Sequence, residues 1–518
     1  MSIVEPIIRD HQVFSQDDNS DSILHVEWQN DVNFFNGAEL RPRTPLCKAT
    51  ADRQITLARA AALIIRTSLN NIPLDIPDFD PCKLNGFPSK LVLGDVTMSV
   101  TIEIFSSLSQ LGVEGEILAK IGPNMAGILQ GTVDPMSLLL ENDRFGRMLD
   151  GMELMQKTRA HLKRYMSLYA TKRPSLNVLE VGASTNRNAA ALGYLSGRRS
   201  VSYTVTNASV QALEQVGSWA PSNSKLKVFN INQNPLEQGF SPESFDVVLV
   251  NNILHMANSL EKSLADLRKL LVPGGALILV GFSDLSPAYN LIFGMNENMW
   301  SDKRCEQLPY PASNEWTRML QNNGFSGLEP ATTTFDFIGQ ESYCVISTAV
   351  ASTQRLMVNI LPDTQGKLFG FADQLSSSLA DANTASTISP ILDEVSSRFI
   401  YVVLDNGSSP LSVYEKLAKA DDVFWISMKT DNIEPRDMHT VTRFAQNAHR
   451  DHPGHKVVTL DVKQDRLDYS DILKVVTRII QVSFQEDRGT RTEVEYEYRN
   501  GRVFVPRVTS SGMKHKLG

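Results

Sequence analysis

Residues 176–197 read LNVLEVGASTNRNAAALGYLSG, and their pattern indicates how the middle of the chain folds. Val178, Leu179 and Val181 supply the apolar run of a buried strand, which also carries an acid, Glu180. The strand meets a turn at Gly182, and a helix is expected after it. A strand, a glycine turn and a helix in this order are typical of the first loop of a cofactor-binding α/β sheet.

The glycines of this loop are altered at the positions that approach a ligand. The loop resembles the one that class I methyltransferases use for S-adenosylmethionine, which usually reads E-x-G-x-G-x-G. The later glycines of such a loop let the backbone come close to the bound molecule. Here Ser184 and Asn186 occupy the second and third glycine positions. The loop is therefore predicted to be obstructed, in a domain kept for its shape.

Length and composition limit the classes of protein that the chain can represent. Its 518 residues predict roughly three or four folding units, and 42% hydrophobic residues suffice for buried cores. A net charge of −8 argues against a nucleic acid or an anionic membrane as partner. No apolar run reaches the ~18–20 residues of a membrane span, and the N-terminal residues lack the layout of a signal peptide.

The cysteines favour a reduced, cytoplasmic protein without a metal site. Four cysteines are scattered and none forms a C-x-x-C pair: Cys47, Cys82, Cys305 and Cys344. Such spacing argues against a disulfide framework and against structural zinc.

Strand and helix patterns alternate over residues 176–348, which predicts a parallel sheet covered by helices. The helical pattern of LEKSLADLRKLL is expected to stop at Pro273-Gly274-Gly275, since proline cannot continue a helix. Before this region, residues 51–69 and 94–172 carry helical spacing. A stripe of Met148, Met152 and Met155 is interpreted as core.

A second α/β pattern begins near residue 353 and ends in a hairpin around Asn500-Gly501, the favoured type I′ pair. Residues 353–508 contain no G-x-G-x-x-G after a strand. They also lack a Tyr-x-x-x-Lys pair for carbonyl reduction. This unit therefore has the topology of a nucleotide-binding domain and is predicted to bind no nucleotide.

Taken together, several stretches resemble the C-methyltransferase domain of fungal highly reducing polyketide synthases over roughly residues 40–348. The stretches are VLEVGASTN, YTVTNAS, FNINQNPLEQGF, FDVVLVNNILHMANSLEKSLADLRKLLVPGGALILV and NEWTRMLQNNGFSGLE. The remainder, through EYEYRNGRVFVPRV, is similar to the structural pseudo-ketoreductase that follows this domain. The resemblance implies a didomain from a larger protein, with neighbouring dehydratase, enoyl reductase and ketoreductase domains and an acyl carrier protein as partners.

The resemblance also assigns positions to the site. Glu180 and Gly182 match the cofactor loop of active members. The acid that serves the adenosyl ribose at the end of the second strand is Asn207 here, and the acid of the third strand is Asn230. The general base is kept as His255, but the position of its acid partner is Gly281.

These changes predict a degenerate, pseudo-methyltransferase site with no cofactor. An amide at position 207 loses the charge-assisted bonds that a carboxylate would accept, about 1 kcal/mol. A base without an acid partner lacks the group that orients its ring. The alternative is an active S-adenosylmethionine-dependent C-methyltransferase acting on the α carbon of a carrier-bound β-ketoacyl chain. A third possibility is a docking module without turnover.

The expected layout has five parts. Residues 1–40 form a linker with a strand, 41–172 a helical lid subdomain, 173–348 a Rossmann-like (pseudo-)methyltransferase core, 349–508 the pseudo-ketoreductase, and 509–518 a tail. The alternating segment SILHVEWQN at residues 22–30 has no partner of its own, and a lone strand is not stable. It is therefore expected to join the C-terminal sheet, which would make the methyltransferase-like region an insertion.

Overall fold

The computed structural model describes residues 8–9, 12–13, 24–40, 48–70, 106–173, 175–183, 201–217, 220, 224–254, 257–295, 313–337, 340–350, 357–382, 384–392, 395–407, 409–428, 438–451, 455–463, 469–484 and 493–510. The chain divides into two compact units. Unit 1 combines residues 1–35 with 351–518, and unit 2 comprises residues 36–350. Unit 2 is thus inserted between two chain segments that fold together.

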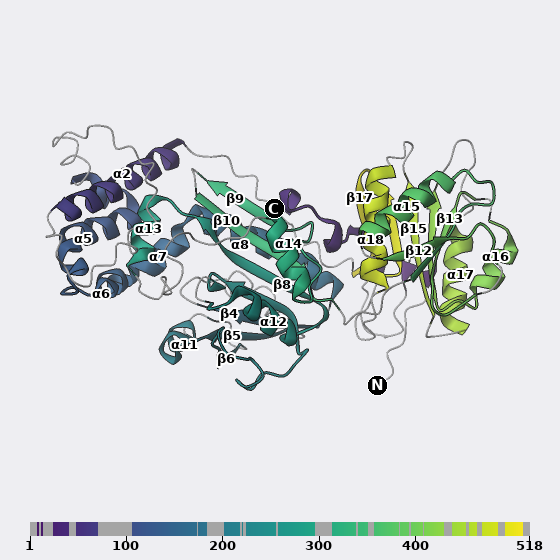
Figure 1. The fold of residues 1–518 in the computed structure, drawn as a ribbon, viewed down its shortest axis with the longest axis horizontal. Helices are drawn as coiled ribbons and strands as arrows, with labels where there is room; N and C mark the ends of the chain where they lie inside the picture. The colour runs from purple at the N-terminus through teal and green to yellow at the C-terminus, as the bar shows by residue number, and fades with distance from the viewer. Residues whose placement is uncertain are drawn as a thin grey trace. The chain divides into compact units, whose positions relative to one another are not determined.

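Unit 2 is built on a seven-stranded sheet with the order β6-β5-β4-β7-β8-β10-β9 (Figure 1). The strands are β4 (Leu176–Val181), β5 (Val201–Asn207), β6 (Lys225–Val228), β7 (Phe245–Asn251), β8 (Leu271–Asp284), β9 (Thr333–Phe337) and β10 (Gln340–Thr348). The first five are parallel, whereas β10 runs antiparallel to both β8 and β9. The expected parallel sheet is confirmed, and β9 is an addition that the sequence pattern did not indicate.

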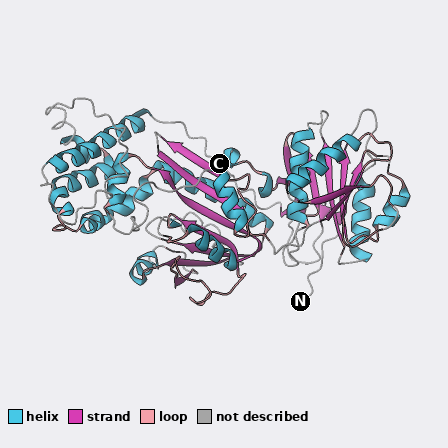
Figure 2. Cartoon of the chain, in the orientation of Figure 1, coloured by secondary structure: helices cyan, strands magenta, loops and turns pink. Residues whose placement is uncertain are grey.

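Helices cover this sheet and extend beyond it (Figure 2). They are α1 (Gly37–Leu40), α2 (Lys48–Asn70), η2 (Leu108–Gln110), α5 (Gly112–Leu129), α6 (Pro135–Leu140), η3 (Glu141–Asp143), α7 (Arg144–Gly151), α8 (Glu153–Lys172), α11 (Val210–Gly217), α12 (Leu260–Leu270), α13 (Pro287–Gly294) and α14 (Ser313–Asn322). Helices α12 and α14 pack on one face of the sheet. Helix α13 packs against α2, so a segment that follows β8 joins the N-terminal helices.

The helical stripe of methionines is confirmed as core, because Met148, Met152 and Met155 are all buried. The stretch forms two helices. Helix α7 ends at Gly151 and α8 begins at Glu153, with extended backbone at Met152 between them.

The helix expected over residues 260–271 is confirmed to within one residue as α12, but the Pro273-Gly274-Gly275 segment is not the turn that stops it. The helix ends at Leu270, and the strand β8 begins at once and contains the Pro273-Gly274-Gly275 segment. The pairing with β7 shifts register here, from Phe245–Leu271 to Val247–Ala276. The left-handed backbone of Gly274, with φ of 73°, accommodates this bulge.

Unit 1 contains a ten-stranded sheet with the order β1-β2-β3-β17-β16-β15-β14-β13-β11-β12. Its strands are β1 (Ile8–Arg9), β2 (Gln12–Val13), β3 (Leu24–Asn30), β11 (Met357–Leu361), β12 (Ala385–Ile388), β13 (Ile400–Asp405), β14 (Asp422–Met428), β15 (Lys456–Lys463), β16 (Glu495–Arg499) and β17 (Arg502–Ser510). Strands β11 to β16 are parallel to their neighbours among these six. The strand order reverses between β11 and β13, which is where doubly wound sheets hold their ligands.

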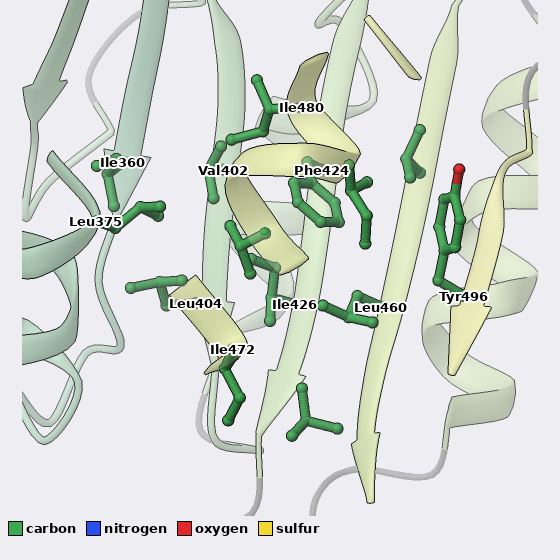
Figure 3. Close-up of a cluster of buried hydrophobic side chains, with 14 of the residues drawn as sticks. Ile360, Leu375, Val402, Leu404, Phe424, Ile426, Leu460, Ile472, Ile480 and Tyr496 are labelled. Carbon is green, nitrogen blue, oxygen red and sulfur yellow. The ribbon is translucent and has the colours of Figure 1, made fainter. Parts of the chain in front are cut away.

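Helices lie on both faces of this sheet. They are η1 (Val32–Phe34), α15 (Phe369–Asp381), α16 (Leu411–Leu417), α17 (Met438–Asp451) and α18 (Tyr469–Ser483). Figure 3 shows the larger core, in which side chains of α15 and α18 meet the central strands. Helices α16 and α17 cover the other face around Trp425. The hairpin β16–β17 turns at Asn500 and Gly501, both with positive φ, as the Asn-Gly pair predicts.

Strand β3 belongs to the sheet of unit 1. It pairs antiparallel with β17 along its whole length, from Asn30 opposite Phe504 to Leu24 opposite Ser510. The η1 turn that follows adds Phe34, whose ring meets that of Tyr496 edge to face at 6.1 Å. The expected pairing of the N-terminal strand with the C-terminal unit is therefore confirmed.

Candidate functional site

The candidate site lies at the carboxyl edge of the unit 2 sheet. Because β4, β5, β7 and β8 are parallel, the residues at their ends converge on one edge. Of the residues assigned from the sequence, Glu180, Gly182, Asn207, Asn230 and Gly281 lie on or next to this edge. Ser184, Asn186 and His255 lie outside the described residues.

Gly182 forms the turn after β4 and has a φ of 83°, which side chains rarely adopt. A Cβ at this position would lie 2.8 Å from the Cβ of Ile253 and 3.0 Å from the carbonyl oxygen of Asn251. The turn therefore packs directly on the loop after β7, and glycine is required by both conformation and space.

Both polar atoms of the Asn207 side-chain amide form hydrogen bonds within the protein. Its Nδ2 donates to the carbonyl oxygen of Ala183 at 2.6 Å, and its Oδ1 accepts from the backbone N–H of Ser209 at 2.9 Å. The N–H of Ala183 also donates to the carbonyl oxygen of Thr206 at 2.9 Å. The start of the loop after β4 is thus fastened to the end of β5. A carboxylate at position 207 could not donate the first of these bonds.

Asn230 is enclosed by a similar set of internal bonds. Its backbone N–H donates to Oε1 of Gln238 at 2.7 Å, and its carbonyl oxygen accepts from Nε2 of Gln238 at 3.0 Å. Its own Oδ1 accepts from the N–H of Asn232 at 3.0 Å. Gln238 therefore holds the backbone of Asn230 on both sides, a role that the sequence analysis did not assign.

Tyr343 fills the space beside Gly281. The two residues lie directly opposite each other in the antiparallel β8–β10 pair. A Cβ on residue 281 would lie 2.5 Å from Cζ and 3.0 Å from Cε1 of the Tyr343 ring. The ring is buried, and its centroid lies 6.2 Å from that of Trp316. The position expected to have lost an acid is therefore occupied by an aromatic side chain from another strand.

Glu180 is completely buried, on the face of the sheet opposite to Leu179 and Val181. Its Oε2 accepts from the hydroxyl of Tyr203 at 2.7 Å, and its Oε1 accepts from Nδ2 of Asn251 at 3.5 Å. Burial raises the pKa of the carboxyl from 4.5 to about 7, although both hydrogen bonds act in the opposite direction. Both carboxyl oxygens of this buried acid are therefore bonded to neighbouring strands of the sheet.

In unit 1, residues at the strand-order reversal between β11 and β13 also form hydrogen bonds with one another. The buried carboxylate of Asp363, just after β11, accepts from the N–H groups of Lys367 and Leu368 at the entry to α15. Asn406, after β13, donates to it from Nδ2 at 3.0 Å. The carboxylate of Asp363 therefore accepts from backbone N–H groups at the place where a nucleotide-binding unit would hold a phosphate.

Neither a metal site nor a membrane span is found among the described residues. No group of three or more His, Cys, Asp or Glu side chains among them could hold a metal ion. None of their helices is long and apolar enough to cross a membrane.

Part of this chain is similar to known methyltransferases. Residues 179–277 match a family model described as a methyltransferase domain. The crystal structure of the trans-methyltransferase CalH in complex with SAH superposes with a TM-score of 0.50 at 20% identity. The match covers 62% of this chain and 99% of that one. The sheet of unit 2 therefore has the fold of class I methyltransferases.

Relatives by sequence are fungal highly reducing polyketide synthases. The synthase AFT9-1 of Alternaria alternata is 26% identical over 537 residues, which is 95% of this chain. The synthase cm3B of Cordyceps militaris is 27% identical over 432 residues, or 76% of this chain. The chain spans only 17% of the length of each of these two relatives.

Proposed function

We propose that this chain is a non-catalytic structural didomain of an iterative highly reducing polyketide synthase. Unit 2 is a pseudo-C-methyltransferase that does not bind S-adenosylmethionine, and unit 1 is a pseudo-ketoreductase. The partners are the dehydratase, enoyl reductase and ketoreductase domains of the same megasynthase and its acyl carrier protein. The didomain scaffolds this region and leaves the polyketide unmethylated.

The observation that carries the proposal is the bonding of Asn207. A ribose diol needs an acceptor at the end of the second strand, yet the amide oxygen already accepts from Ser209 and the amide nitrogen faces Ala183. A ligand would have to share the amide oxygen with the N–H of Ser209 and would gain no charge-assisted bond from it. The residues present therefore do not fit the cofactor, and no methyl transfer step is assigned to them.

Titration calorimetry tests this proposal directly. The full chain is expected to give no saturable heat with S-adenosylmethionine or S-adenosylhomocysteine. The losses at Ser184, Asn186, Asn207 and Asn230 together cost about 4 kcal/mol, which converts a micromolar dissociation constant into a millimolar one.

The control is a variant that restores all four positions: Ser184→Gly, Asn186→Gly, Asn207→Asp and Asn230→Asp. Binding by this variant alone would locate the defect in these residues. Asn207→Asp by itself is not expected to bind, because its carboxylate would face the Ala183 carbonyl oxygen. A micromolar isotherm with the unaltered chain would contradict the proposal and favour the active C-methyltransferase, with His255 as its base.

The absence of nucleotide binding by unit 1 is a separate prediction. Addition of NADPH is expected to give no saturable change in fluorescence, because Asp363 already occupies the N–H groups that a phosphate would need. Asp363→Asn tests this explanation, because the amide oxygen of asparagine accepts hydrogen bonds from these N–H groups more weakly than a carboxylate does. Saturable binding by the unaltered chain that is abolished by a substitution within residues 357–407 would count against an architectural role.

A further inference from the structure

The carboxyl of Glu180 is a buried titratable group for which the proposed function has no use. Its side chain is 0% exposed. It lies at the junction of β4, β5 and β7, where Tyr203 and Asn251 each donate one hydrogen bond to it. Its backbone carbonyl oxygen also accepts from the hydroxyl of Thr206 at 2.8 Å. The carboxyl is therefore joined to both neighbouring strands, two residues before the Gly182 turn.

No cation among the described residues compensates a charge at this position. None of their Lys, Arg or His side chains forms an ion pair with Glu180 or influences its pKa. Among the described residues, the groups that face it are Tyr203 from β5, which is titratable, and Asn251 from β7, which is neutral. An uncompensated buried carboxylate is costly, and such groups are held in their protonated form instead.

We propose that Glu180 is a proton-binding switch that couples the stability of the unit 2 carboxyl edge to pH. With its proton, the carboxyl is a neutral group bonded to both neighbouring strands. Without it, a bare charge remains between β4, β5 and β7 with two neutral donors. Loss of the proton therefore loosens the strands that carry Gly182 and Asn207.

The direction of the pH dependence follows from the raised pKa. Between pH 4.5 and about 7 the folded unit holds a proton that the unfolded chain has already released. Stability contributed by this proton is full below pH 4.5 and is lost as the pH rises to about 7. At higher pH both states are ionised, and the dependence ends. The total effect on the unfolding equilibrium is on the order of a hundredfold.

The test compares the full chain with Glu180→Gln (E180Q), whose side chain cannot ionise. Urea unfolding is followed by pulsed hydrogen exchange in the peptides of β4 and β5, so that unit 2 is observed separately from unit 1. We expect E180Q to raise stability at about pH 8 by on the order of a hundredfold in the unfolding equilibrium, relative to its effect at about pH 4.5. Glu237→Gln, which removes an exposed carboxylate, controls for net charge.

A second variant keeps the proposal testable should E180Q fold poorly. Tyr203→Phe removes a hydrogen bond that favours the charged form, so the fall in stability is expected to extend to higher pH. Infrared spectra at about pH 6, below the raised pKa, should also contain a protonated carboxyl band that E180Q lacks. The switch is excluded if E180Q changes stability equally at both pH values, or if the band is absent. Neither outcome depends on S-adenosylmethionine binding.

Discussion

A chain that begins at residue 40 is expected to lose the cooperative fold of unit 1 and to aggregate. The truncation removes β3, which pairs with β17 from Leu24 to Asn30, and Phe34, which packs on Tyr496. Backbone hydrogen bonds contribute roughly 1 kcal/mol each. The loss of a whole strand is therefore comparable to the roughly 5–15 kcal/mol that holds a typical domain together. It also leaves β17 as a long unprotected edge, and such edges pair with other chains.

Size-exclusion chromatography and thermal unfolding measure this effect. The matched control is a chain that begins at residue 22, which keeps β3 and loses the two-residue strands β1 and β2, of which β2 pairs with Leu24 and His25 of β3. This control is expected to remain monodisperse with the unfolding transition of the full chain. The importance of β3 would be refuted by a residue-40 chain that is equally soluble and unfolds at the same temperature.

Replacement of Gly281 by Glu is expected to destabilise unit 2 by roughly 3 kcal/mol or more and to give no methyl transfer. The new side chain would overlap the ring of Tyr343, and overpacking a core costs about 1–3 kcal/mol before the burial of a carboxylate is added. Activity stays absent because the acid partner that the resemblance assigns to His255 has no use without a bound methyl donor. Unfolding in denaturant and mass spectrometry of a β-ketoacyl thioester mimic provide the two measurements.

A double-mutant cycle separates the clash from the chemistry. Tyr343→Ala alone leaves a cavity and is expected to cost about 3–5 kcal/mol. Combined with Gly281→Glu, it removes the overlap, so the two changes together should cost less than their sum by at least about 1 kcal/mol. Additive effects would mean that Tyr343 does not fill the space at position 281. Methylated product from the single Gly281→Glu variant would mean that the cofactor site is intact.

Elements whose signal is local could be predicted from the amino-acid sequence alone. The apolar runs of β4 and β7 predict buried parallel strands because both faces of such a sheet are covered. The Asn500-Gly501 pair predicts its hairpin because both residues tolerate positive φ. Strand β12 was missed because it is short, half exposed and polar in composition, so neither its length nor its periodicity stands out.

The candidate site was predicted only as a set of positions. The pattern E-x-G and the resemblance named Glu180, Gly182, Asn207 and Gly281, and the structure brings these ends of parallel strands to one edge. What each side chain does there could not be read from the pattern. An asparagine in place of an acid indicates a lost bond to a ligand, but not a new bond to Ala183.

Which side chains fill the site depends on contacts between strands that are distant in the sequence. Tyr343 lies over Gly281 because β10 pairs antiparallel with β8 in one particular register, and a shift of one residue would turn the ring to the other face. The raised pKa of Glu180 likewise depends on complete burial without a cation among the described residues, which arises only when β5 and β7 close around β4. Local patterns fix elements because backbone preferences act over a few residues. Contacts and pKa values depend on side chains that the chain brings together from distant positions.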